Sequence, residues 1–241
     1  MHAAVVIFPG SNADVEMIHT LRDVVQVRTT VVWHREHELP PDTDLVALPG
    51  GFSYGDYLRC GAIAKVSPIL AAVRAHAARG GLVLGVCNGF QILTEAGLLP
   101  GALTRNAHLR FECRDIFVTA DADGPFTHGL VGRTLRLPIA HAEGRYQAAP
   151  DVLRALKDEG RIALSYTTPT GEASAASNPN GSALSIAGVY GGPNKNILGL
   201  MPHPERMSEA LHGSTDGRLL FESAVRAASS SVTAPHVGAG A

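Results

Sequence analysis

Short apolar segments alternate with amphipathic ones along the first hundred residues of the chain. The apolar segments have few polar positions, as expected of strands that are buried on both faces of a sheet. They lie at residues 3–8, 26–33, 44–49 and 81–86. Amphipathic segments predict helices at 14–24, at about 61–79, either continuous or interrupted near Pro68, and at 88–96. Strands that alternate with helices in this way predict a parallel sheet covered on both faces.

The pattern changes after Gly97, where strands are predicted without long helices between them. These strands lie at residues 111–119, 134–141, 162–166 and 197–201, so we expect antiparallel additions to the sheet. A loop is expected at 167–181 and a last helix at 217–228. Residues 229–241 are small and lack the apolar content to pack, which predicts a disordered tail. The predicted fold is therefore α/β, with three layers around a mostly parallel sheet, in one domain over residues 1–228.

Composition narrows the classes of function. The chain has 241 residues, 20 basic and 22 acidic side chains and a net charge of −2, with no basic block, so nucleic-acid binding has no electrostatic support. No apolar stretch reaches membrane-spanning length, and the first strand begins too close to Met1 for a secretion signal. Three widely spaced cysteines form neither a disulfide framework nor a zinc ribbon. We therefore expect a cytoplasmic protein.

The most informative residue is Cys87, at the corner between the strand at 81–86 and the helix at 88–96. Gly85 and Gly89 stand two positions to each side, which lets the strand and the helix pass closely around a strained turn. The helix N-terminus beside the side chain favours a thiolate over a thiol. A cysteine after an apolar strand is more often a small core residue, so the corner predicts a reactive thiol only if a base lies nearby.

His203 is the candidate base. It follows the apolar strand at residues 197–200, and the prolines on each side of it favour an extended backbone. In an extended segment Glu205 lies on the same side as His203 and can fix the tautomer of its imidazole. The C-terminal ends of parallel strands form one crevice, so His203 and Cys87 are expected to meet there. Taken alone, His203 is better explained as a hydrogen-bonded structural histidine.

An acyl-transfer nucleophile also needs donors for the oxyanion. The backbone N–H of Asn88 lies at the start of the helix after Cys87, and a second donor can come from the glycine turn at 49–52. A glycine turn of this kind is also common where an ordinary strand ends, and on local evidence that explanation fits at least as well. Gln91 lies one helical turn after Cys87, so its amide is a candidate substrate contact or else a solvated helix residue.

Two further motifs predict no site of their own. Residues 50–56 are rich in glycine but lack the lysine and serine pattern of a phosphate-binding loop. Residues 141–145 place a histidine and a glutamate in one loop, and two ligands from a single loop are a poor basis for zinc. No metal is predicted.

The residues at 85–91 (GVCNGFQ) and at 201–206 (MPHPER) resemble the triad-type, class I glutamine amidotransferases, whose fold is flavodoxin-like. Other segments resemble the glutamine amidotransferase subunits of phosphoribosylformylglycinamidine synthase, from purine biosynthesis, and the resemblance spans about residues 3–226. These segments are 8–12, 48–56, 138–146 and 178–182. The chain departs from the family at Ala13, where cysteine is frequent, at Ala142, where glycine is frequent, and in a longer stretch at 168–176.

The resemblance implies a role for each matching residue. Cys87 is the nucleophile, His203 the base and Glu205 the group that orients it. Gly51 and Asn88 supply the backbone donors of the oxyanion hole. Gln91 and the loop from His141 to Gly144 line the glutamine pocket.

The resemblance also implies the reaction and its partners. Glutamine is hydrolysed to glutamate and ammonia, and the ammonia passes to a large synthetase subunit, which works with a small accessory subunit. The synthetase, which carries ATP and magnesium, makes formylglycinamidine ribonucleotide from formylglycinamide ribonucleotide. This chain itself is expected to carry no cofactor. Two alternatives remain open from the sequence: a stand-alone γ-glutamyl cysteine hydrolase on the same fold, and a non-catalytic subunit that keeps the corner as scaffold.

Overall fold

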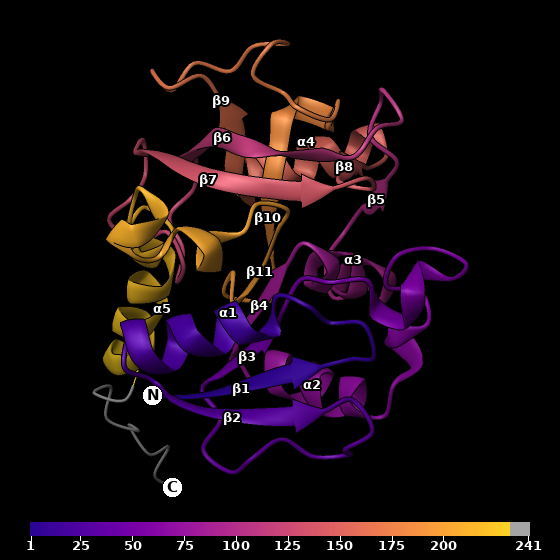
Figure 1. Cartoon of the computed structure of the whole chain (residues 1–241), viewed down its shortest axis with the longest axis vertical. Helices are drawn as coiled ribbons and strands as arrows, with labels where there is room; N and C mark the ends of the chain where they lie inside the picture. Colours follow the sequence, from indigo (N-terminus) through magenta and orange to yellow (C-terminus); the bar gives the residue numbers. More distant parts are fainter. Residues whose placement is uncertain (232–241) are drawn as a thin grey trace, which may run out of the picture.

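The computed structural model describes residues 1–231. A nine-stranded sheet forms the centre of the fold (Figure 1). The strand order is β2-β1-β3-β4-β11-β10-β9-β6-β7. The strands are β1 (His2–Ile7), β2 (Arg28–Trp33), β3 (Leu45–Leu48), β4 (Leu82–Val86), β6 (Glu112–Ala120), β7 (Thr134–His141), β9 (Ile162–Thr167), β10 (Ile186–Gly191) and β11 (Ile197–Leu200). A separate two-stranded sheet pairs β5 (Ala102–Thr104) with β8 (Arg145–Gln147).

The sheet is parallel in its first half and antiparallel in its second. Strands β2, β1, β3, β4 and β11 pair in parallel, whereas β10, β9, β6 and β7 are added antiparallel beyond β11. Every residue of β3, β4 and β11 is buried, which explains why these strands read as unbroken apolar runs. The predicted α/β fold, mostly parallel with antiparallel additions, is confirmed.

Helices cover both faces of the parallel strands. In Figure 1, α1 and α5 lie together on one face, and α2 and α3 lie on the other. The helices are α1 (Asp14–His19), continued by a π-helical turn (Thr20–Val24), α2 (Ile69–Ala78), α3 (Asn88–Glu95), α4 (Pro150–Asp158) and α5 (Arg218–Ser231). Within residues 1–231, no helix is both long and apolar enough to cross a lipid bilayer.

The structure decides two helix boundaries that the sequence left open or misplaced. The helix predicted at about 61–79 is interrupted at Pro68, which is one of the two possibilities considered: Ala64–Val66 form a 3-10 turn, and α2 begins at Ile69 because Pro68 forces Ser67 into an extended conformation. Helix α5 runs to Ser231, three residues past the predicted end of the domain, so the tail predicted at 229–241 begins too early. Residues 232–241 lie outside the described part of the chain.

The sequence pattern missed β10, the two short strands β5 and β8, and helix α4. Strand β10 contains Gly188 and Gly191, and glycines inside a segment weaken the signal of a strand. Both glycines are required by close packing, since a Cβ at Gly188 would meet the backbone of Gly199 in β11 and a Cβ at Gly191 would meet Leu99.

Gly89 fixes how closely α3 packs on the sheet. A Cβ at this position would collide with the carbonyl oxygen of Leu48 in β3, which is backbone and has no other rotamer to adopt. Gly89→Ala is therefore expected to lower the free energy of unfolding by more than about 2 kcal/mol, measured by urea denaturation. The control is Gly129→Ala, where φ is +75° and no atom lies within 4 Å, so only backbone strain of about 1 kcal/mol is expected. Equal losses would contradict the close approach.

Candidate active site

Cys87 occupies the corner that the sequence predicts. Its backbone has φ 50° and ψ −104°, a conformation that β-carbon sterics disfavour, and it is held on both sides. The Cys87 N–H donates to Leu200 O at 2.8 Å, and its carbonyl accepts from the Gln91 N–H at 3.1 Å, the first turn of α3. The side chain is only 6% exposed. A strained backbone turn at a sheet edge, fixed by hydrogen bonds on both sides, is typical of a nucleophilic residue. It is not typical of a residue that only packs in the core.

His203 reaches Cys87 because their strands are neighbours. Strands β4 and β11 pair in parallel with Val86 opposite Leu200, so the segments that follow them leave the sheet at the same edge. The His203 imidazole lies close enough to Cys87 for the two groups to interact, and this interaction raises the pKa of His203. The Cys87 thiol itself donates to the carbonyl of Ala140 in β7 at 3.8 Å. The expectation that the two strand ends bring Cys87 and His203 together is confirmed.

Glu205 contacts His203, though not in the way the sequence predicts. Pro204–Met207 form a 3-10 turn instead of an extended segment, because proline is well suited to the first position of a helix. The His203 Nδ1–H donates to Glu205 Oε1 at 2.5 Å, across this turn. Both side chains are buried, at 3% and 0% exposed. The short contact fixes the tautomer of His203 and leaves Nε2 for the thiol.

The electrostatics favour a charged imidazole at His203. Burial by itself lowers the pKa of His203, but the charges of Glu205 and Cys87 and the hydrogen bonds to both overcome that effect and raise the pKa well above its usual value. His203 is therefore able to hold the proton that leaves the Cys87 thiol.

Two backbone segments flank the reactive pair. The glycine turn after β3 packs directly on His203, since a Cβ at Gly50 would lie 2.7 Å from the imidazole ring. Gly51, at φ +151°, forms an isolated bridge with Ser11. The Asn88 side chain ties this turn to α3 by accepting from the Ser53 N–H at 3.1 Å. The predicted oxyanion donors, the N–H groups of Gly51 and Asn88, thus lie in segments joined beside Cys87, and their role remains a prediction.

Gln91 is buried, so it is not a solvated helix residue. Its Nε2 donates to the carbonyl of Glu143 at 2.7 Å, and its Oε1 accepts from Asn88 Nδ2 at 2.9 Å. Its amide therefore joins α3 to the loop from His141 to Gly144. A direct contact of Gln91 with a substrate stays a prediction, as does the pocket role of His141 and Gly144.

Sequence reasoning missed Asn106, which bonds to this same loop from the irregular segment after β5. The Gly144 N–H donates to Asn106 Oδ1 at 3.1 Å, and the Asn106 N–H donates to Ala142 O at 2.9 Å. No periodicity marks an asparagine in a loop, so local patterns contain no signal for it.

Other features lie away from the reactive pair. A groove of about 590 Å³ between the end of α3, α4 and β10 is lined by none of the three residues Cys87, His203 and Glu205. Among residues 1–231, no group of three or more His, Cys, Asp and Glu side chains is placed to hold a metal ion. That the chain works without a metal or cofactor remains a prediction.

A strained cysteine corner with a His–Glu pair at the adjoining strand end defines the class of α/β proteins that perform acyl transfer through a thiol. The family model for the CobB/CobQ-like glutamine amidotransferase domain matches residues 1–225. The chain belongs to this family and, within it, to the family of phosphoribosylformylglycinamidine synthase subunits PurQ.

The similarity to individual relatives is high over nearly the whole chain. The chain is 52% identical to the PurQ subunit of Bradyrhizobium diazoefficiens over 223 residues, which are 92% of this chain and 95% of the relative. It is 50% identical to that of Gloeobacter violaceus over 230 residues, which are 95% and 98% of the two chains.

The comparison with solved structures supports the same family assignment. A chain in the structure of PurLQS from Thermotoga maritima superposes with a TM-score of 0.81 at 39% identity, covering 93% of this chain and 97% of that one. A glutamine amidotransferase from Thermotoga maritima, with a TM-score of 0.56 at 17% identity and coverage of 95% of this chain and 92% of that one, shares the fold alone. The resemblance expected from the sequence is confirmed.

Proposed function

We propose that this chain is the glutaminase subunit of phosphoribosylformylglycinamidine synthase and that Cys87, His203 and Glu205 are its catalytic triad. The observation that carries the proposal is the buried Cys87–His203–Glu205 chain of contacts at the joined ends of β4 and β11. Membership of a glutamine amidotransferase family supports glutamine as the acyl donor.

The geometry supports a two-step acyl transfer. His203 takes the proton of the Cys87 thiol, and the thiolate attacks the carboxamide carbon of glutamine. The N–H groups of Gly51 and Asn88 donate to the oxygen that becomes negative. His203 then returns its proton to the departing ammonia, which leaves a γ-glutamyl thioester on Cys87. A water molecule, deprotonated by His203, hydrolyses the thioester to glutamate and restores the thiol. Glu205 holds the imidazole in place throughout.

The ammonia is a substrate for a partner subunit, the synthetase. The Thermotoga maritima relative is described as PurLQS, which supports an assembly of this chain with a large synthetase and a small accessory subunit. In that assembly the synthetase converts formylglycinamide ribonucleotide to its amidine and binds the ATP and magnesium that this step requires. All three cysteines of the chain are free, which fits work in the reducing cytoplasm.

The proposal is tested by co-purifying the chain with its synthetase and measuring glutamate and ammonia released from glutamine. Hydrolysis is expected to rise at least about tenfold when the synthetase, ribonucleotide and ATP are all present, because ammonia released without an acceptor is wasted. The isolated chain and the complex without ribonucleotide are the controls. Full activity of the isolated chain, unchanged by the synthetase, would instead identify a stand-alone γ-glutamyl hydrolase.

A further inference from the structure

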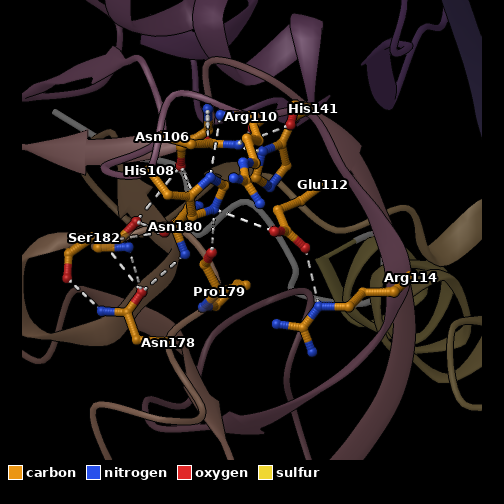
Figure 2. Close-up of polar contacts among 12 residues, drawn as sticks. Asn106, His108, Arg110, Glu112, Arg114, His141, Asn178, Pro179, Asn180 and Ser182 are labelled. Carbon is orange, nitrogen blue, oxygen red and sulfur yellow. Dashed lines mark hydrogen bonds and ion pairs between the residues drawn. The ribbon is translucent and has the colours of Figure 1, made fainter.

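Asn106 lies at the centre of a hydrogen-bonded cluster around the loop from His141 to Gly144 (Figure 2). The Asn106 side chain is completely buried, at 0% exposed. Its Nδ2 donates to the carbonyls of His141 at 2.9 Å and Arg110 at 2.8 Å, which uses both of its hydrogens. Its Oδ1 accepts from the Gly144 N–H at 3.1 Å. One side chain therefore bonds to both ends of the loop.

These partners determine which way the Asn106 amide points. Carbonyl oxygens only accept hydrogen bonds and the Gly144 N–H only donates, so a flipped amide would place two acceptors against Oδ1 and a donor against Nδ2. The oriented Oδ1 also lies 3.1 Å from Nδ1 of His141. An acceptor at that position requires the proton of the imidazole to be on Nδ1.

His141 carries no second proton at neutral pH. Its pKa is lowered to about 4, chiefly by burial and to a smaller extent by the charges of His203 and His108. Its side chain is 3% exposed, and its Nε2 is buried with no hydrogen-bond partner in the described part of the chain. His141 is thus a neutral imidazole with a bare Nε2, within the electrostatic range of the catalytic base.

Two further hydrogen bonds hold the loop from His141 to Gly144 in place. Gln91 Nε2 donates to Glu143 O at 2.7 Å, and Asn180 Nδ2 donates to Gly144 O at 2.8 Å. Gly144 packs against the His141 ring so closely that a Cβ would collide with it. A side chain at position 144 would therefore displace the imidazole.

We propose that Asn106 is a positioning residue that fixes the Nδ1-protonated tautomer of His141 and, as an uncharged amide in a buried site, offers an imidazolium there no counter-charge, so that burial can keep a second positive charge away from His203. The electrostatic interaction is reciprocal. The charge of His203 disfavours a positively charged His141. A positively charged His141 would in turn disfavour the imidazolium that forms when His203 takes the proton of the thiol. The catalytic consequence rests on the proposed glutaminase function, whereas the tautomer is a property of the protein alone.

The tautomer is read directly by NMR on the whole chain labelled with ¹⁵N-histidine, with the His141 signals assigned by their loss in His141→Asn. We expect Nδ1 protonated, Nε2 unprotonated, and no titration of the ring until the pH approaches about 4. A proton on Nε2, or an imidazolium at neutral pH, would overturn the proposal whether or not the protein is a glutaminase.

Asn106→Asp tests the catalytic consequence in the complex with the synthetase. The carboxylate still accepts from Gly144 and from Nδ1, but its negative charge favours a protonated His141 and raises its pKa. Activity is then lost as the pH falls through this raised value, so the acidic limb of kcat/KM for glutamine is expected to move to higher pH by about one unit or more.

Asn178→Asp is the matched control, because Asn178 accepts from the Gly181 and Ser182 N–H groups in the same cluster without touching His141. Its acidic limb is expected to match that of the parent. Parent-like pH profiles for both variants would show that Asn106 acts only as a structural support. If the Asn106→Asp variant fails to fold, the tautomer measured in the parent protein decides the proposal.

Discussion

Replacing Cys87 with alanine is expected to lower glutamine-dependent synthesis of the amidine by at least about 10⁴-fold, while synthesis from added ammonia by the same complex continues. The expectation follows from the chemistry, because no other group at the joined ends of β4 and β11 can form the thioester. Alanine fills nearly the same volume, so the corner and the surface seen by the synthetase remain. The measurement is the rate of amidine formation with glutamine and, separately, with an ammonium salt.

Cys113→Ala is the control, since Cys113 is a free and exposed cysteine on β6. It is expected to retain the parent's rate with either nitrogen source. Normal glutaminase activity in Cys87→Ala would refute the mechanism. A Cys87 that resists a glutamine-analogue alkylating agent even in the complex would favour the non-catalytic alternative.

Glu205→Gln is expected to lower kcat for glutamine hydrolysis by about 10³–10⁴-fold with little change in KM, as amide replacements do in related triads. Glu205 Oε1 accepts the Nδ1–H of His203, and both groups are buried. An amide can present its NH₂ to that nitrogen, which places the ring proton on Nε2 and removes the base from Cys87. The amide also removes a charge that raises the pKa of His203. Steady-state kinetics in the complex measure both parameters.

Glu209→Gln makes the same change at a half-buried carboxylate, which pairs with His19 instead. It is expected to leave kcat unchanged. A Glu205→Gln variant with more than about a tenth of the parent's kcat would show that His203 needs no orienting group, because a triad partner normally contributes far more.

The sequence was sufficient where the signal is local. Strands β3, β4 and β11 are buried along their whole length, so they had to be apolar runs. The corner at Cys87 needs a strained dihedral between glycines two positions away, and those neighbours are visible in the chain. The contact of Glu205 with His203 spans two residues, and it was anticipated even though the turn between them was not.

The tertiary structure decided what long-range packing controls. The glycines of β10 weaken its strand signal, and only the fold shows why they are there: Gly188 lies against the backbone of β11 and Gly191 against Leu99. Asn106 and His141 are 35 residues apart, and only the folded chain shows that one amide sets the tautomer of the other side chain. By itself the sequence determined the buried strands β3, β4 and β11 and the backbone corner at Cys87, because their signals depend on near neighbours. The hydrogen-bond partners of buried polar groups depend on which distant segments the fold brings together, and only the tertiary structure decided those.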